Sequence, residues 1–405
     1  MVLRAMQRFR TSVAPMVDVT DPCFLRLLRL ISPFGNHQLW TEMIHANTFS
    51  RGKMHHDRTK LAYHVPVTEL HDFADGIVVQ LGASQPSDAY EAVHALASLG
   101  VRHVNLNCGC PSRNVQMGAF GAVLMKTPEE TAQIVRAMVQ AACEAEVAAA
   151  ATTTGSHGMA ISVKCRIGID DNESLGFLEN FVSSVTEAGG SSVDLVVHAR
   201  RAWLAGLSPK ENRTVPQLNH TRVYEVAAKF PHVRISLNGG IDTVDAVAQH
   251  LQSPLIASVM IGRKIREDPW FLALLDQNIY GVPEAQIPKR ARVLDQYLGF
   301  ADAMHEDIGV RYSVFGRPLY AFFTGRKGRA MRAHMCRLFA QARKQAAGQS
   351  SGAIHQYAVP FSQIVREAEA AAEAEYIERQ ARATVFSNDA SVQPAELVSE
   401  AVSPG

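Results

Sequence analysis

Two cysteines and two asparagines lie close together in residues 104–112, which read VNLNCGCPS. The first four of these residues predict the end of a buried β-strand, which Gly109 and Pro111 then stop. Cys110 therefore lies on the loop just after a strand, where parallel α/β folds bind their ligands. A thiol in that place can act as a nucleophile or as a proton donor. The alternative is a small apolar side chain that happens to lie on a turn.

Polar residues at the ends of other predicted strands favour the chemical interpretation of Cys110. In order along the chain, the strand ends are Met16, Glu42, Gln80, Asn107, Lys164 with Arg166, His198, Asn238 and Gly262. Burying such groups without partners costs roughly several kcal/mol each, so their repetition indicates a polar site that faces a ligand. A lone histidine is more often a satisfied core residue, but the two arginines that follow Ala199 weaken that interpretation for His198.

Eight short runs rich in β-forming residues predict the strands that hold these side chains. They cover residues 12–16, 38–43, 77–81, 102–107, 161–166, 194–198, 234–238 and 258–262. Helical patterns follow several of them, at residues 86–99, 128–146, 174–188, 221–230 and 243–251. Strand followed by helix, repeated over roughly 250 residues, is typical of an α/β protein with a (β/α)8 TIM barrel. The alternative, a doubly wound sheet, would need a glycine-rich turn after the first strand, and residues 14–18 (APMVD) are not one.

Glycines follow the last two predicted strands. The two runs are Asn238-Gly239-Gly240 and Gly262-Arg263. Glycines let backbone N–H groups approach a phosphate closely, and an arginine adds a charge-assisted contact. The loops after strands seven and eight are the usual phosphate site of a TIM barrel, although a glycine pair can also serve only as a tight turn. We therefore expect a phosphorylated ligand, with Lys164 and His198 near its body.

The composition is that of an ordinary globular protein. Among 405 residues, 47% are hydrophobic and 20% are charged, and the formal net charge of +1 gives no case for nucleic acid by itself. No apolar run reaches the ~20 residues of a membrane span. The six cysteines show no framework pattern, which favours a reducing compartment. We expect the cytoplasm, and the arginine-rich N-terminus leaves a mitochondrial or other organellar location as the alternative.

Cys108 and Cys110 could form a strained disulfide, but free thiols are the preferred interpretation. We expect no metal, because these two cysteines lack a second ligand pair at zinc spacing. Residues 148–157 (AAAATTTGSH) are of low complexity and predict a surface insertion without chemistry.

The pattern changes after Gly281. We predict a TIM-barrel domain over residues 1–283, a helical domain over 284–345 and a helical or flexible acidic tail over 346–405. Residues 281–347 hold 12 Lys and Arg against 5 Asp and Glu, whereas residues 348–405 hold 3 against 8. The near-zero total charge therefore hides a basic helical region followed by an acidic one. The basic region is a candidate surface for a nucleic-acid backbone.

Several runs along the chain resemble one enzyme family. They are APMVD from Ala14, QLG from Gln80, NLNCGCPS from Asn105, VKCRIGIDD from Val163, HARRAWL from His198, GLSPKENR from Gly206 and NGGI from Asn238. Together they resemble the tRNA-dihydrouridine synthases, and the long matches at 198–213 resemble the A-type subfamily. The resemblance covers roughly residues 8–340. It implies bound FMN, NADPH as the reductant, and reduction of uridines 20 and 20a in the D loop of tRNA by a protein that we expect to be monomeric.

The resemblance also implies roles for individual residues. Cys110 matches the general acid that protonates C5 while flavin N5 delivers hydride to C6, and Asn107 and Arg166 match uracil contacts. The positions that match FMN contacts are Pro15, Met16, Val17, Gln80, Lys164, His198, Asn238, Gly239, Gly240, Gly262 and Arg263. Lys210 and Arg213 match a pair that orients tRNA, and the basic run with Arg326 and Arg329 is predicted to contact tRNA from the helical domain.

One residue departs from the family pattern. Cys165 stands where the family often has histidine, and strand alternation predicts that it points away from the site, so we expect a packing change. Two other functions stay open. The first is an FMN barrel that reduces a free pyrimidine or a small enone, and the second is a catalytically idle RNA-binding barrel.

Overall fold

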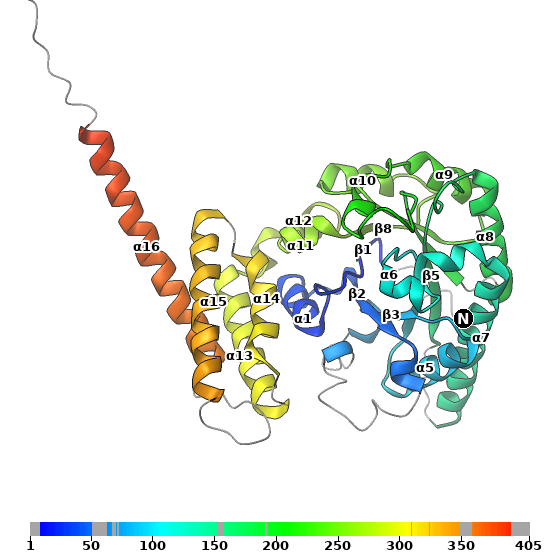
Figure 1. Cartoon of the computed structure of the whole chain (residues 1–405), viewed down its shortest axis with the longest axis horizontal. Coiled ribbons are helices and arrows are strands. Elements are labelled where there is room, and N and C mark those ends of the chain that lie inside the picture. The colour runs from blue at the N-terminus through cyan, green and yellow to red at the C-terminus, as the bar shows by residue number, and fades with distance from the viewer. Residues whose placement is uncertain are drawn as a thin grey trace, which may run out of the picture. The chain divides into compact units, whose positions relative to one another are not determined.

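The computed structural model describes residues 9–50, 63–66, 70, 73–152, 158–190, 193–308, 310–323, 325–347 and 359–389. Eight parallel strands close into a barrel in sequence order, and helices surround it (Figure 1). The strands are β1 (Thr11–Val13), β2 (His37–His45), β3 (Ile77–Gly82), β4 (His103–Cys108), β5 (Ala160–Arg166), β6 (Val193–His198), β7 (Ile235–Asn238) and β8 (Ser258–Ile261). The predicted TIM barrel is confirmed, and every predicted strand overlaps an observed one.

The helices that accompany the barrel begin after each strand. They are α1 (Pro22–Ile31), α2 (Asn47–Ser50), α5 (Pro86–Ser98), α6 (Arg113–Met117), α7 (Pro128–Thr152), α8 (Leu175–Gly189), α9 (His220–Lys229), α10 (Val244–Leu251), α11 (Arg263–Glu267) and α12 (Phe271–Asn278). The five helices expected from the sequence are all present. The structure extends α7 through residues 148–152 of the expected insertion, and residues 153–157 lie outside the described part of the chain.

Two strand ends differ from the sequence-based expectation. β1 ends at Val13 instead of Met16, because Pro15 has no N–H to continue the ladder. β2 runs on to His45, and its pairing with β3 shifts between Trp40 and Met43. Glu42 therefore lies at an irregularity within the strand, not at its end.

The inner face of the strands carries polar side chains beside a small apolar cluster around Trp40, whereas the outer face is apolar. Asn105, Ser162 and Lys164 share the inner face with Gln80, because Gln80 pairs with Asn105, Asn105 pairs with Ser162, and Lys164 is two residues further along β5. The outward-facing residues of the same strands pack under the helices in the main hydrophobic core, and Cys165 is among them. The predicted orientation of Cys165, away from the site, is confirmed.

The chain divides into two compact units, residues 1–321 and 322–405. The first contains the barrel with α13 (Arg290–Ile308) and nearly all of α14 (Tyr312–Phe322). α13 packs against α1. From α14, the Arg317 side chain lies 3.8 Å from the Asp21 carboxylate, which also caps α1 by accepting from the Phe24 N–H.

The second unit contains the helices α15 (Gly325–Ala347) and α16 (Phe361–Asp389), which pack against each other. The Phe339 ring stacks on the Phe361 ring at 5.6 Å between centroids. Lys327 forms an ion pair with Glu373, and His334 lies 3.1 Å from a Glu375 oxygen. The basic helix predicted from the sequence is thus partly paired with acidic residues of the next helix. None of the described helices combines the length and the apolar character that crossing a bilayer requires.

Candidate active site

The Asn107 side chain holds the loop of Cys110 in place. Its Oδ1 accepts hydrogen bonds from the N–H of Gly109 at 3.0 Å and of Cys110 at 2.9 Å. Its Nδ2 donates to Gln80 Oε1 at 2.8 Å. An asparagine that bonds to backbone two and three residues onward stabilises a turn, so Cys110 is fixed at the mouth of the barrel.

A chain of amides continues from Asn107 across the barrel interior. Gln80 Nε2 donates to Asn105 Oδ1, and Asn105 Nδ2 donates to Ser162 Oγ, both at 2.8 Å. Buried polar groups that satisfy one another in this way form a rigid network. The Asn107 amide is therefore occupied within the protein, and its predicted contact with uracil stays a prediction.

The two neighbouring cysteines have different surroundings. Cys108 is completely buried in the main core, and burial raises the pKa of its thiol. Cys110 is only partly buried, and all six cysteines are free thiols. Behind Cys110, Gly121 adopts φ +77°, and a Cβ there would lie 2.7 Å from the Cys110 carbonyl oxygen. Cys110 is therefore the thiol of this pair with access to a ligand.

Lys164 extends inside the barrel toward β7. Its Nζ donates to Asn238 Oδ1 at 3.1 Å, and Asn238 Nδ2 donates to the Met260 carbonyl at 2.8 Å. Burial, followed by the charge of Arg166, lowers the pKa of Lys164 to about 8. The ammonium group is thus charged at neutral pH and close to the point at which it loses its proton.

His198 is held neutral by its surroundings. Burial lowers the pKa of its imidazole, and nearby cations, Arg166 first among them, lower it further. Gly239, with φ +115°, lies against this ring, since a Cβ there would be 2.7 Å from His198 Cδ2. A neutral histidine beside a glycine turn can offer one donor and one acceptor to a ligand.

Arg166 bridges two loops, the one after β4 and the one after β6. Its Nε donates to the Gly109 carbonyl at 2.8 Å, and its Nη1 donates to the carbonyls of Arg201 at 3.0 Å and Asn212 at 3.1 Å. These donors fix loops around the pocket and are not free for a substrate. The predicted uracil contact of Arg166 is left to Nη2 and stays a prediction.

The loop after β1 meets the loop after β8. A Cβ on Gly262 would lie 3.3 Å from the Ala14 Cβ and 3.8 Å from the Met16 sulfur. Val17 is 59% exposed at the turn of the same loop, and Pro15 is half-buried. The structure therefore brings Met16 and Gly262 together, as expected of two parts of one binding site.

Cations surround the mouth of the barrel. Burial and the charges of Arg266 and Arg263 lower the pKa of Arg213, and burial and the charge of Arg263 lower that of Arg200. Mutual repulsion of this kind shows that the arginines lie near one another. With Lys164 inside, the mouth is suited to an anionic ligand. Within the described residues, no cluster of three or more His, Cys, Asp or Glu could hold a metal ion.

A family model described as Dihydrouridine synthase (Dus) matches residues 12–351 of this chain. The chain belongs to the dihydrouridine synthase family. The match takes in the whole barrel with α13, α14 and α15, whereas α16 lies beyond it. The family suspected from the sequence motifs is thereby confirmed.

Curated members of the dihydrouridine synthase family are similar over most of their length. The tRNA-dihydrouridine(20/20a) synthase of Vibrio cholerae is 38% identical over 294 residues, which cover 72% of this chain and 80% of the relative. The enzyme of the same name from Shewanella oneidensis is 36% identical over 325 residues, covering 80% and 87%. That from Xanthomonas campestris is 38% identical over 319 residues, covering 79% and 85%.

The residues predicted to contact tRNA are spread over both units of this dihydrouridine synthase. Lys210 is exposed and Arg213 is half-buried on the loop after β6. Arg329 is exposed on α15, in the second unit, and the side chain of Arg326 is outside the described part of the structure. Their joint contact with one RNA molecule stays a prediction.

Some residues that hold the loops around the site, without facing it themselves, were not predicted from the sequence. Gln116, Asp170 and Asn212 bond to the backbone of loops at the barrel mouth. Gly121 needs its positive φ and its lack of a Cβ. These residues lie in loops, where neither strand alternation nor helical periodicity marks them. The only signal was that Asp170 and Asn212 fall inside runs that resemble the family.

Proposed function

We propose that this protein reduces uridines 20 and 20a in the D loop of tRNA to 5,6-dihydrouridine, with FMN as the bound cofactor, NADPH as the reductant and Cys110 as the proton donor. The observation that carries the proposal is the placement of Cys110, which Asn107 holds at the cationic mouth of a dihydrouridine synthase barrel. The names of the similar enzymes support the substrate and the positions. By analogy with these bacterial relatives, we place the enzyme in the cytoplasm.

The barrel residues fit a flavin mononucleotide. Gly239 and Gly240 adopt φ +115° and +69° after β7, a turn that glycine permits, and without side chains their backbone N–H groups would let a phosphate approach closely. Arg263 begins α11 directly after Gly262 and can neutralise a phosphate at these loops. Lys164 lies inside, where an anionic or electron-rich ring edge would be stabilised by its charge. These residues would hold the cofactor, as the sequence motifs implied.

The protein's own part in the reaction is placement and protonation. Bound flavin would supply the hydride that the C5=C6 bond of uracil requires. Cys110 would donate the proton to C5, and its position is fixed through its backbone by Asn107. The uridine must leave the tRNA stack to reach this thiol, which costs roughly a few kcal/mol. Cations at the mouth offset that cost through contacts with the RNA backbone.

We predict that flavin binding weakens above pH 8. Lys164 has a pKa of about 8, so its charge is present below that pH and is lost as the pH rises through it. The affinity of the apoprotein for FMN should be constant from pH 6.5 to about 7.5 and then fall by up to about tenfold per pH unit. Fluorescence titration of FMN across this range measures the effect.

The matched control for this titration is Lys164→Met, which has no charge to lose. It should bind FMN more weakly at every pH and show no break near pH 8. A break of the same size in this variant would show that another group is responsible.

The experiment that tests the proposed function compares substrates. Purified protein with FMN and NADPH should form dihydrouridine in unmodified tRNA and not from free uridine. Turnover of free uridine at a rate equal to that of tRNA would favour the alternative, a barrel that reduces free pyrimidines. A protein that binds tRNA but cannot be loaded with any flavin would favour the idle RNA-binding barrel.

A further inference from the structure

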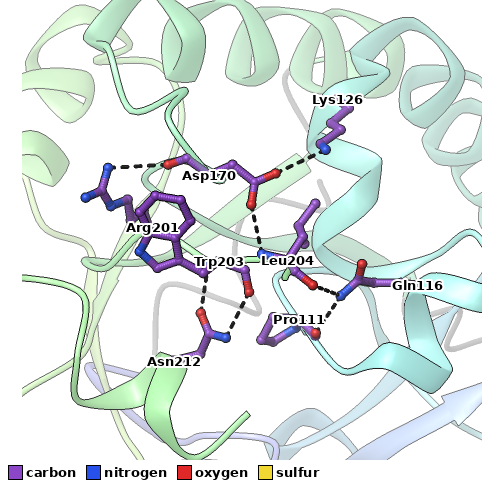
Figure 2. Close-up of polar contacts among 8 residues, drawn as sticks. All are labelled: Pro111, Gln116, Lys126, Asp170, Arg201, Trp203, Leu204 and Asn212. Atoms are coloured by element: carbon purple, nitrogen blue, oxygen red, sulfur yellow. Dashed lines mark hydrogen bonds and ion pairs between the residues drawn. The ribbon is translucent and has the colours of Figure 1, made fainter. Parts of the chain in front are cut away.

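The loop after β6, residues 199–216, is folded around a buried asparagine. Asn212 has no exposed surface, its Oδ1 accepts from the Trp203 N–H at 2.7 Å, and its Nδ2 donates to the Trp203 carbonyl at 2.9 Å (Figure 2). The Trp203 ring lies against the guanidinium of Arg201, 4.6 Å from its centroid. We call this segment the β6 loop, and its internal bonds give it a fixed shape.

Asp170 anchors the β6 loop to the end of β5. Its Oδ1 accepts from the Leu204 N–H at 2.9 Å, and its Oδ2 lies 3.1 Å from Lys126 Nζ. The backbone of Asp170 adds two more bonds, to Ala202 at 2.8 Å and to Arg201 at 3.3 Å. Asp170 adopts φ +47°, a conformation that a non-glycine residue keeps only where its surroundings determine it.

Gln116 joins the β6 loop to the loop of Cys110. It lies on α6, six residues after Cys110, and its Nε2 donates to the carbonyls of Pro111 and Leu204, both at 2.8 Å (Figure 2). Both hydrogens of one amide group are thus used on two different loops. Arg166 makes a second bridge between the same loops, from the Gly109 carbonyl to those of Arg201 and Asn212.

We propose that Gln116 is a positioning residue for the proton donor, which it acts on through the Pro111 carbonyl. This inference rests on the proposed function of Cys110. Asn107 fixes the Cys110 backbone on the side of β4, and Gln116 fixes the following residue against the β6 loop. The backbone that carries the thiol is therefore fixed by Asn107 on one side and by Gln116 on the other. Gln116 can hold it because Asp170 anchors the β6 loop that Gln116 also contacts. A displacement of about 1 Å at a reacting group can cost roughly 10²-fold in rate.

The amide is the group that this place requires. Glutamate has the same length, but its carboxylate would put two acceptors against two carbonyl oxygens. Methionine fills the same volume and has no donor. If the hydrogen bonds that Gln116 donates to the Pro111 and Leu204 carbonyls position Cys110, both Gln116→Met and Gln116→Glu should displace Cys110. If only the volume of the Gln116 side chain matters, Gln116→Met should leave Cys110 in place.

The test uses Gln116→Met and Gln116→Glu in the flavin-loaded enzyme. We expect the single-turnover rate of uridine reduction at saturating tRNA to fall roughly 10- to 100-fold in both. Flavin content, NADPH oxidation by the flavin and the tRNA dissociation constant should stay within about twofold of the wild type, because Gln116 contacts neither ligand in this account. Gln140→Ala is the control, since Gln140 is an exposed glutamine on α7 whose amide donates to the Glu144 carboxylate.

A second measurement reads the position of the thiol without RNA. Peptide-resolved mass spectrometry should show a changed rate of Cys110 alkylation by iodoacetamide in both Gln116 variants, with Cys143 and Cys336 as exposed internal references. Unchanged alkylation together with an unchanged single-turnover rate would overturn the positioning role. A wild-type protein that does not reduce tRNA would instead overturn the proposed function, and the alkylation result would still decide whether Gln116 positions the thiol.

Discussion

Cys110→Ala is expected to lower the rate of uridine reduction in tRNA by roughly 10²–10⁴-fold, the usual contribution of a positioned general acid. Its flavin content and the reduction of that flavin by NADPH should be unchanged, because neither step uses the thiol. Cys110 is the partly exposed cysteine of the CGC run, on a loop that Asn107 holds by two backbone bonds. Single-turnover reduction of tRNA by the pre-reduced enzyme measures the step directly.

Cys108→Ala is the matched control for this variant. The Cys108 side chain is completely buried in the main hydrophobic core, so it cannot reach a ligand in the barrel mouth. Burial also raises the pKa of its thiol. This variant should lose some thermal stability and keep most of its single-turnover rate. Equal rate losses in the two variants, at equal stability, would show that the assignment of the proton donor to Cys110 is wrong.

The second large effect concerns the basic helix α15. This helix carries seven Lys and Arg and no Asp or Glu. Lys327 is already paired with Glu373, and Arg332 donates to the Phe323 carbonyl at 3.0 Å. Arg329 is exposed, and it is therefore a better candidate for a phosphate contact than either of them, together with Arg326 in the same turn.

The double variant Arg326→Glu with Arg329→Glu should bind tRNA roughly 10²–10⁴-fold more weakly, taking about 1.5–3 kcal/mol for each of the two charged hydrogen bonds. Each lost phosphate contact should also flatten the salt dependence of binding by about one unit of log–log slope. Binding measured across a salt series reports both quantities. NADPH oxidation by the bound flavin should be unchanged, because that step needs no RNA.

The charge-matched control is Arg136→Glu with Lys229→Glu. Arg136 is exposed on α7. Lys229 is the last residue of α9, and because α9 runs back along the barrel after β6, Lys229 lies at the end of the barrel away from the strand C-termini. This control should keep the salt dependence of tRNA binding that the wild type shows. If the α15 variant had the same slope and affinity as the control, α15 would not contact RNA, and the alternative of a free pyrimidine substrate would gain support.

Strand alternation made the inner site predictable from the sequence. Lys164 and Arg166 face the interior and Cys165 faces the helices, because side chains on a strand alternate between its faces. The position of Cys110 on a loop follows from another rule, because Gly109 weakens a strand and Pro111 has no N–H with which to continue it. Where the backbone is a regular strand, the residue types alone were sufficient to predict which side chains face the site.

The supports of the site could not be predicted in this way. Gln116 and Asp170 act through bonds to the backbone of distant loops, 88 and 34 residues along the chain. The irregularity of β2 that displaces Glu42 from the strand end also depends on the neighbouring strand. Such contacts depend on how the loops fold in space, and no local pattern encodes them.

The most direct test of the central claim is to map the product on tRNA. A tRNA transcript with uridine at positions 20 and 20a is incubated with the flavin-loaded protein and NADPH, and dihydrouridine is located by mass spectrometry of nuclease fragments. We predict dihydrouridine at 20 and 20a with the wild type and a rate roughly 10²–10⁴-fold lower with Cys110→Ala. Dihydrouridine only at other positions, or none at all with a flavin that NADPH reduces normally, would contradict this prediction.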